Sequence, residues 1–223
     1  PREDYDAYLS RVNRSVFSPY TQRLIRAATG LILRKPITVI GDPYWTDVFV
    51  KDVDGCGSDL DEYARRLLIC ALTYGHSHTL VDFPAPTGAR SLAEERNQNR
   101  RPYWIEVDPA NIYGWRLDRE VNYGKLVQVR IAEQAVVPEG DFGERVYDQI
   151  RVIEPGNYRI YRKKETTKDM YTEDNTFAGN FDSPANEKDY ELVESGEFSL
   201  GEIPLVTVYA GKTDTMASKP PLL

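Results

Sequence analysis

The clearest pattern of hydrophobic and polar positions lies between residues 60 and 74. Apolar side chains recur there every three or four residues, as on one face of an α-helix: Leu60, Ala64, Leu67, Leu68, Ala71 and Leu72. Nearly every residue from 67 to 74 is apolar, which predicts that this half is covered on several sides. Ser58, followed by Asp61 three residues later, fits a capping box, and Gly75 can adopt the left-handed conformation that ends a helix. The pattern therefore predicts one central, buried helix.

The residues on either side of this helix predict one strand and two further helices. His78 to Phe83 alternate in polarity and predict a short strand. Residues 3–17 predict a first amphipathic helix, with apolar positions at Tyr5, Tyr8, Leu9, Val12 and Val16. Ser18, followed by Pro19, predicts the start of a second helix that ends at Pro36. The inner face of this second helix is expected to carry Tyr20, Leu24, Ala27, Ala28 and Leu31.

From residue 101 the polarity alternates with a period of two, which predicts strands. The predicted strands cover residues 103–107, 112–117, 125–133, 145–153, 157–162, 190–194 and 205–209. Turn residues separate them at 108–111, 118–124, 138–140 and 154–157. A further short strand is expected earlier, at 47–50. Strands that follow one another so closely favour an antiparallel meander.

The order of these elements predicts an α+β protein. The N-terminal helices and the central buried helix are expected to pack on a mostly antiparallel sheet. We expect a single domain over residues 1–223, with a helix-rich part at 1–84 and a strand-rich part at 101–210. Residues 163–188 are polar and too numerous for an ordinary loop, which predicts a mobile or interfacial insertion.

Composition and charge narrow the class of protein. The 223 residues are 28% charged and 41% apolar, as in an ordinary globular protein. The net charge of −7 argues against an outer surface that binds nucleic acid non-specifically. The two cysteines, Cys56 and Cys70, give no disulfide framework and are expected as free thiols in a reducing compartment. No apolar run approaches the length of about 18 residues that spans a membrane, so no membrane partner is expected.

His76 and His78 are the two histidines of the chain and its candidate metal ligands. In an extended segment they lie on one face, about 6.6 Å apart. A metal-dependent hydrolase could use such a pair, but a third ligand is missing. Asp82 shares the face and lies about 13 Å further along the strand from His78, too far for one ion. Two polar residues at a helix–strand junction are the alternative interpretation.

Asp52 and Asp54, with Gly57 at the sixth position, have the spacing of a calcium-binding loop. The twelfth position is Tyr63, where a bidentate Glu is required, so a glycine-rich loop that leads into Ser58 is the better interpretation. The chain contains no nucleophile elbow and no phosphate-binding loop. We therefore assign no catalytic, cofactor-binding or metal-binding residue, expect no cofactor, and expect a protein that is not an enzyme.

Aromatic and arginine residues gather in the strand-rich part of the sequence. They are Tyr103, Trp104, Tyr113, Trp115, Tyr123, Arg100, Arg101, Arg116 and Arg119. Such a set could form a stacking platform for single-stranded nucleic acid, so a nucleic-acid-binding module stays open as an alternative function. Aromatic pairs across a sheet, or a subunit interface rich in Trp, Tyr and Arg, are the simpler interpretations.

An ordered series of short motifs extends over nearly the whole chain. In the helix-rich part these are Tyr5-x-x-Tyr8-Leu9-x-Arg11, Thr21-x-Arg23-Leu24-Ile25, Gly30-Leu31-Ile32-Leu33-Arg34-Lys35-Pro36, Gly57-x-x-Leu60, Tyr74-Gly75-His76 and Leu80-Val81-Asp82-Phe83-Pro84. Later motifs are Arg101-Pro102-Tyr103, Ile112-Tyr113-Gly114-Trp115-Arg116, Ile203-Pro204-Leu205-Val206 and Pro220-Pro221-Leu222-Leu223. Together, and not singly, they resemble portal proteins of tailed bacteriophages, the head-to-tail connectors, in a group often described only as a domain of unknown function.

The resemblance implies a structural subunit of a ring, usually a dodecamer, at one vertex of the capsid in the virion. Such a ring is the channel for packaging and ejection of double-stranded DNA, docks terminase and tail adaptor proteins, and joins head to tail. The chain is similar to the outward wing region of the family, and a longer parent protein is expected to carry the stem, clip and crown. A ring requires a heterologous interface, for which the first two helices, the aromatic–arginine region and residues 163–188 are candidates.

Overall fold

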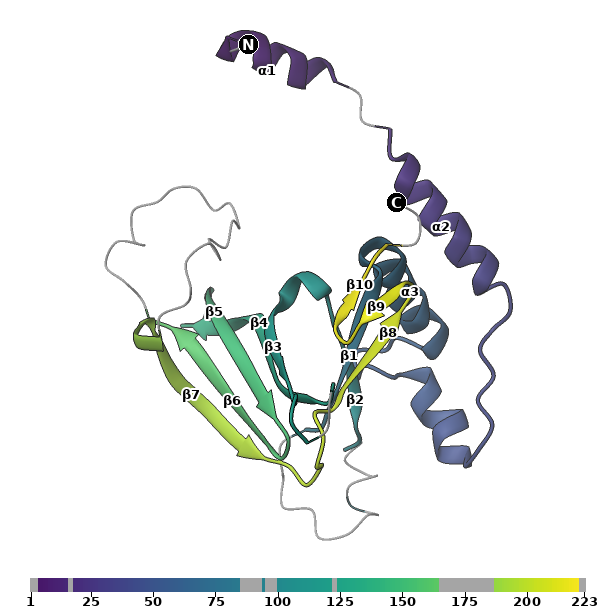
Figure 1. Ribbon diagram of the computed structural model, residues 1–223, viewed down its shortest axis with the longest axis vertical. Helices are drawn as coiled ribbons and strands as arrows, with labels where there is room; N and C mark the ends of the chain where they lie inside the picture. The colour runs from purple at the N-terminus through teal and green to yellow at the C-terminus, as the bar shows by residue number, and fades with distance from the viewer. Residues whose placement is uncertain are drawn as a thin grey trace.

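The protein combines helices, mostly in its first third, with antiparallel strands. The computed structural model describes residues 4–15, 18–84, 94, 100–121, 124–164 and 187–220. Its elements are α1 (Tyr5–Arg14), α2 (Tyr20–Ile32), η1 (Tyr44–Val48), η2 (Phe49–Lys51), α3 (Leu60–Tyr74), β1 (His76–Asp82), β2 (Tyr103–Val107), η3 (Pro109–Asn111), β3 (Ile112–Leu117), β4 (Leu126–Glu139), β5 (Gly143–Glu154), β6 (Asn157–Lys163), η5 (Glu187–Asp189), β7 (Tyr190–Glu197), β8 (Leu205–Tyr209), β9 (Lys212–Asp214) and β10 (Ala217–Ser218). In Figure 1, α2 and α3 lie to one side of the strands, and α1 stands apart from both.

The strands form two antiparallel sheets and a small hairpin. The three-stranded sheet has the order β2-β1-β8, the five-stranded sheet has the order β3-β4-β5-β6-β7, and β9 pairs with β10. In the middle of the smaller sheet, Leu80 of β1 lies opposite Ile105 of β2 and Leu205 of β8. The five-stranded sheet is the meander that the sequence predicts. The α+β class with a mostly antiparallel sheet is confirmed.

The three-stranded sheet lies between α3 and the five-stranded sheet. On the α3 side, the hydroxyl of Tyr63 donates a hydrogen bond to Oγ1 of Thr79 at 2.9 Å. Tyr63 also belongs to a buried cluster with Phe49 and Val53. On the other side, a larger buried cluster joins the two sheets, and its members are Leu80, Val107, Val129, Ile131, Ile153, Ile203 and Met216. The central helix is therefore buried against a sheet, as the sequence predicts.

Asp59, and not the predicted Ser58, caps α3. Oδ1 of Asp59 accepts a hydrogen bond from the backbone N–H of Glu62 at 2.8 Å. Oγ of Ser58 instead accepts a hydrogen bond from Nη1 of Arg66 at 2.9 Å. The sequence rule cannot choose between two adjacent residues that both cap well, because the Arg66 side chain, about two turns further along, decides the choice. Gly75 ends the helix as predicted, with φ at 89°.

The apolar stripe that the sequence assigns to the inner face of α2 lies on its outer face. The buried residues of α2 are Ile25 and Thr29. Tyr20, Leu24 and Leu31, which were expected inside, are 72%, 52% and 75% exposed. The prediction is wrong because helical spacing reveals an apolar stripe but not which face of the helix the rest of the protein covers.

Two local predictions before α3 are also wrong. Ser18 does not cap α2, whose N-cap is Pro19 and has no side-chain cap hydrogen bond. Residues 47–50 lie in the helical turns η1 and η2 and not in a strand. Asp42 starts these turns, because its Oδ1 accepts the N–H of Tyr44 at 2.8 Å and its carbonyl oxygen accepts the next N–H at 3.0 Å. An apolar run of four residues does not distinguish a strand from a helical turn.

The strand predictions agree best where strands are short. The predicted bounds of β2, β3 and β8 match the structure. In contrast, β4 continues beyond the predicted residue 133 to Glu139, and β5 begins at Gly143, before the predicted residue 145. Pro138 pairs with Glu144 in the ladder, so the predicted turn at 138–140 is displaced to 140–142. The hairpin of β9 and β10 was not predicted. Val16, Tyr123, most of residues 163–188 and residues 221–223 lie outside the described residues.

Candidate functional site

The two candidate metal ligands, His76 and His78, lie next to each other on β1. Their ring centroids are 4.9 Å apart and the ring planes meet at 77°. Nδ1 of His78 lies 2.9 Å from Oγ1 of Thr207 on β8. Nδ1 of His76 is hydrogen-bonded to Oγ of Ser218 on β10. Each imidazole therefore joins the central strand to a segment near the C-terminal end of the described chain.

No third ligand joins this pair in the part of the chain that the structure describes. Asp82 is engaged elsewhere, with Oδ2 3.1 Å from Nη1 of Arg151 on the five-stranded sheet. Across the described ranges, no group of three or more His, Cys, Asp and Glu side chains is arranged to hold a metal ion. The geometry of the pair fits a structural junction between strands.

Burial lowers the pKa of both imidazoles. His78 is fully buried, and burial together with the nearby His76 lowers its pKa to about 4. Burial also lowers the pKa of His76, although a hydrogen bond with the backbone of Tyr74 opposes the shift. Both rings are therefore neutral at pH 7. Among the described residues, Nε2 of His78 has no hydrogen-bond partner, so a proton added there would be a buried charge.

The loop before α3 uses its two carboxylates to hold its own backbone. Oδ1 of Asp52 and Oδ1 of Asp54 accept backbone N–H groups of the same loop at 2.8 to 3.1 Å. Oδ2 of Asp52 lies 2.6 Å from Arg101, and Oδ2 of Asp54 lies 3.1 Å from Arg66. Burial alone would raise the pKa of Asp54, but hydrogen bonds from Ser58, the loop backbone and Arg66 hold it well below its usual range. The loop thus works as a rigid entry to α3, the interpretation that the sequence favours.

The aromatic and arginine residues of the strand-rich region are divided between different parts of the fold. Trp104 is packed in the core with Phe49 and Tyr63, at ring centroid distances of 5.2 and 5.4 Å. Arg101 is 4% exposed and paired with a carboxylate. Trp115 lies on β3 of the other sheet and is 41% exposed. The described members of the set therefore do not gather into one stacking surface.

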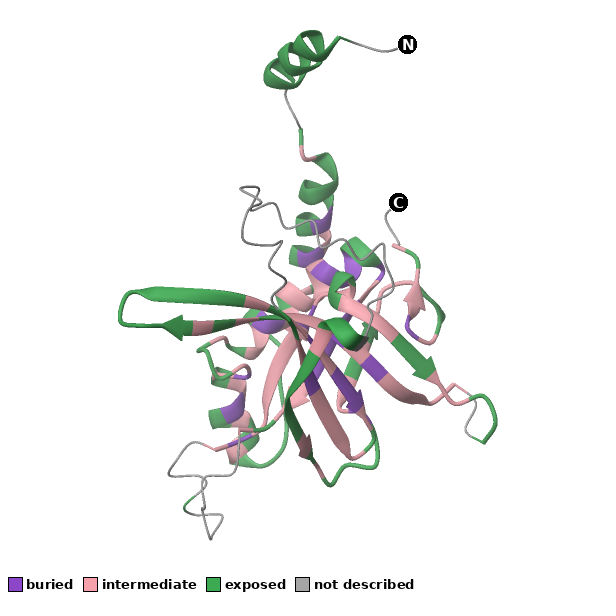
Figure 2. Ribbon diagram, turned by 90° about the vertical axis from the view of Figure 1, so that its left-hand side faces the viewer, coloured by how far each residue is buried: buried purple, intermediate pink, exposed green. Residues whose placement is uncertain are grey.

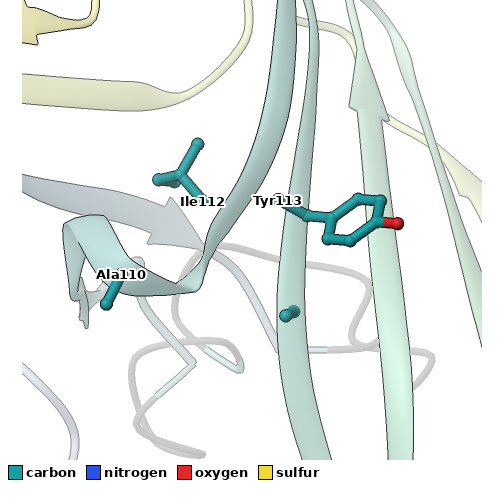
Figure 3. Close-up of a pocket in the computed structure, with 4 residues that line it drawn as sticks. Ala110, Ile112 and Tyr113 are labelled. Atoms are coloured by element: carbon teal, nitrogen blue, oxygen red, sulfur yellow. The ribbon is translucent and has the colours of Figure 1, made fainter. Parts of the chain in front are cut away.

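A shallow pocket of about 390 Å³ opens beside the start of β3. The residues that line it are Ala110, Ile112, Tyr113 and Ala132. Figure 3 shows Ala110 on η3 and Ile112 and Tyr113 at the beginning of the strand. Of these described lining residues, Tyr113 alone carries a titratable side chain, so they supply no pair of nucleophile and base.

The helix α1 exposes an apolar face. None of its residues is buried. Tyr5, Tyr8, Leu9 and Val12 recur at spacings of three, one and three residues, which places them on one side of the helix, and they are 38 to 69% exposed. A helix of 10 residues is marginal in water unless its apolar face is covered. The sequence names this helix as a candidate contact surface, and its apolar residues are exposed.

The second exposed apolar face is the α2 stripe, which consists of Tyr20, Leu24, Ala27 and Leu31. These residues follow at spacings of four, three and four, and all are exposed. At about 100° per residue, the stripe lies on the side of the helix opposite to its two buried residues. Arg23 borders it, with its guanidinium carbon 6.0 Å from the centre of the Tyr20 ring.

The third exposed surface is the β4–β5 arm, residues 134–148. In Figure 2 the exposed ends of these two strands project well beyond the body of the molecule. Val136 and Val146 lie opposite each other on the arm and are 57% and 55% exposed. Phe142 is fully exposed in the connecting turn. The arm is not predicted from the sequence, because the first predicted strand ends at residue 133, the next starts at residue 145 and 138–140 are assigned to a turn, whereas β4 continues to Glu139 and β5 begins at Gly143.

Comparison with known proteins gives no family assignment. No protein-family model matches this chain, and no curated protein matches it significantly. In the described ranges, no helix has both the length and the apolar character needed to cross a membrane. The three exposed surfaces and the motif series are therefore the features from which a function is inferred.

Proposed function

We propose that this chain is a structural subunit of a portal ring of a tailed bacteriophage, located at the capsid vertex of the virion. In this function, copies of the chain surround a channel through which double-stranded DNA is packaged and ejected. The ring joins head to tail and binds terminase and tail adaptor proteins. The motif series quoted above supports the proposal from the sequence, and the exposed apolar faces of α1 and α2 support it from the structure.

The observation that carries the proposal is the amount of apolar helix surface left without cover. Fully burying a side chain the size of Leu or Phe stabilises a protein by about 1.5–3 kcal/mol. Tyr20 and Leu31 are 72% and 75% exposed, and no residue of α1 is buried, so most of that stabilisation is absent in the single copy. Contact with another copy would provide it, and apolar helix faces of this kind are typical of subunit interfaces.

The charge of α2 favours contacts between two different surfaces of neighbouring copies over contacts between two identical surfaces. No Asp or Glu occurs from residue 7 to residue 41. In this stretch α2 carries Arg23 and Arg26, and Arg34 and Lys35 follow directly after it. Two copies that met through α2 alone would place these like charges against one another. A heterologous, head-to-tail contact avoids this repulsion, and it closes into a ring when the rotation per copy permits.

The overall charge agrees with a channel. The net charge of −7 disfavours tight binding to the phosphate backbone of DNA. A conduit must let DNA move through it, so a weakly repulsive protein suits this function better than a strongly basic one.

Particle mass and particle shape test the proposal. We expect masses that are multiples of the 25.5 kDa chain, increasing with concentration, and electron micrographs of closed rings with a central hole. A protein that stays monomeric up to its solubility limit contradicts the proposal, and so does one that stops at a two-fold symmetric dimer.

A pair of variants in α1 separates assembly from folding. Tyr8→Asp places a charge on the apolar face of the helix, and Ser10→Asp places the same charge on the opposite face. Both residues are exposed, so both variants should fold normally. We expect Tyr8→Asp to raise the concentration needed for assembly by at least about tenfold, which corresponds to 1.4 kcal/mol. Ser10→Asp should assemble like the unmodified protein.

A further inference from the structure

We infer that the β4–β5 arm of one copy binds the α2 stripe of the next copy. The inference rests on the proposed function, because it names the contact that would link neighbouring subunits. Both surfaces are exposed on the single copy, and they belong to different parts of the fold (Figures 1 and 2). An arm that engages a different surface on its neighbour makes a heterologous contact, which is the kind that a ring needs.

The receiving surface is apolar, with positive charge beside it and after the end of its helix. Tyr20, Leu24, Ala27 and Leu31 form its apolar centre. Arg23 borders the stripe, and Arg26, Arg34 and Lys35 lie on the same helix or directly after it, all of them exposed. With no acidic residue between positions 7 and 41, nothing in this stretch of sequence offsets the positive charge.

The arm has the opposite charge and a matching apolar centre. Val136 and Val146 face each other across the hairpin. Because side chains alternate along a strand, Glu144 and Asp148 lie on the same face as Val146, one on each side of it. Residues 134–148 contain four acidic residues and one arginine, a net charge of −3. The arm thus presents an apolar patch between carboxylates, the complement of an apolar stripe beside arginines.

The two surfaces also match in length. From Tyr20 to Leu31 the stripe extends about 17 Å, at 1.5 Å per residue of helix. The paired part of the arm, from the Gln134–Asp148 pair to the Glu139–Gly143 pair, extends about 17 Å at 3.4 Å per residue. Laid along the helix, the arm would cover the whole stripe, and Phe142 at its tip would reach the end of it.

Charge reversal on either side tests the contact. The α2 variant carries Arg23→Glu and Arg26→Glu, and the arm variant carries Glu144→Arg and Asp148→Arg. All four side chains are exposed, so each variant should keep its fold, which thermal unfolding can check. We expect each variant alone to assemble at least about tenfold less readily, because like charges then meet in the contact.

Mixing the two variants is the decisive step. The unmodified acidic arm of the α2 variant can bind the unmodified basic helix of the arm variant, and the two reversed surfaces also attract each other. An equal mixture should therefore assemble nearly as well as the unmodified protein, and high salt should weaken that assembly. If each variant assembles normally on its own, or if the mixture fails to recover, the arm–stripe contact is wrong while the ring remains. If the unmodified protein never assembles, the proposed function fails with it.

Cysteine cross-linking supplies a measurement that does not depend on a stable complex. In a Cys56→Ala background, which removes the exposed native thiol, Phe142→Cys chains are mixed with Leu24→Cys chains and oxidised. We expect a disulfide-linked heterodimer, and far less of it when Val121→Cys, 83% exposed and on neither surface, replaces Leu24→Cys. Equal yields contradict the contact. Cross-linking of Leu24→Cys to Tyr8→Cys instead would assign the α2 stripe to α1 and overturn the inference.

Discussion

The helices α3 and α2 carry similar apolar stripes and meet opposite environments. In α3 the stripe lies against the three-stranded sheet, and Cys70, Ala71 and Leu72 are buried. In α2 the stripe of Tyr20, Leu24, Ala27 and Leu31 faces outward, and two residues on the other side, Ile25 and Thr29, make the contact with the body. The difference shows that an amphipathic pattern indicates an apolar helix face but does not identify what covers it. The covering partner can belong to the same chain or to another one.

Two leucine truncations should test the difference between α3 and α2 with the largest expected effect. Leu72 of α3 is 8% exposed and Leu31 of α2 is 75% exposed. We expect Leu72→Ala to lower the free energy of unfolding by about 2–5 kcal/mol, because it removes buried methyl groups and leaves a cavity. We expect Leu31→Ala to change it by no more than about 0.5 kcal/mol. Urea unfolding at low protein concentration, where copies do not assemble, measures both values.

At high concentration the second variant should behave differently. If Leu31 is covered in an assembly, Leu31→Ala should weaken assembly although it leaves the stability of the single copy unchanged. Equal losses of stability for the two truncations at low concentration would mean that α2 is covered within the single chain, and the contrast between the helices would disappear.

The strand that follows α3 adds a pH-dependent component to the stability of the buried region. The pKa of His78 is lowered to about 4, so the folded protein holds this imidazole in its neutral form. The unfolded chain, with a pKa of about 6.5, binds a proton more readily between these two values. The stabilisation is therefore present above pH 6.5 and is lost as the pH falls toward 4, by about 2 kcal/mol between pH 8 and pH 5.

A substitution isolates this contribution from that of the carboxylates. His78→Gln removes the titrating group, so the difference in unfolding free energy between pH 8 and pH 5 should shrink by about 2 kcal/mol relative to the unmodified protein. His76→Gln, at a half-buried position whose pKa is lowered by burial, should have a smaller effect. An unchanged pH dependence in His78→Gln would show that the imidazole is not held neutral in the folded state.

The comparison also explains which features were predictable from the sequence. The existence of α3, its end at Gly75 and the strands at 103–107, 112–117 and 205–209 were predicted, because local periodicity and turn residues determine them. The division of the strands between two sheets was not predicted, because it depends on contacts between residues far apart in the sequence. His76 and His78 were correctly placed on one face of an extended segment.

The surfaces proposed for assembly show the limit of local patterns. The α2 stripe was found in the sequence and assigned to the wrong side, because the contact through Ile25 and Thr29 is a tertiary one. The β4–β5 arm is missed because the predicted strand ends at residue 133 and a turn is predicted at 138–140, whereas Pro138 belongs to the strand and pairs with Glu144. Both errors concern exposed apolar residues, where the rule that apolar means buried fails for a single copy of the chain.

The start of each helix provides the smallest and sharpest test of the difference between α3 and α2. Asp59 caps α3 through its side chain, whereas α2 begins after Pro19 without a side-chain cap. Asp59→Ala should cost about 1 kcal/mol of unfolding free energy, and Asp59→Asn, which can still accept the N–H of Glu62, should cost only a few tenths. Ser18→Ala, at the position where the sequence wrongly predicts a cap, should have almost no effect. A loss of about 1 kcal/mol from Ser18→Ala would mean that α2 is capped after all, and its start would then be as firmly fixed as that of α3.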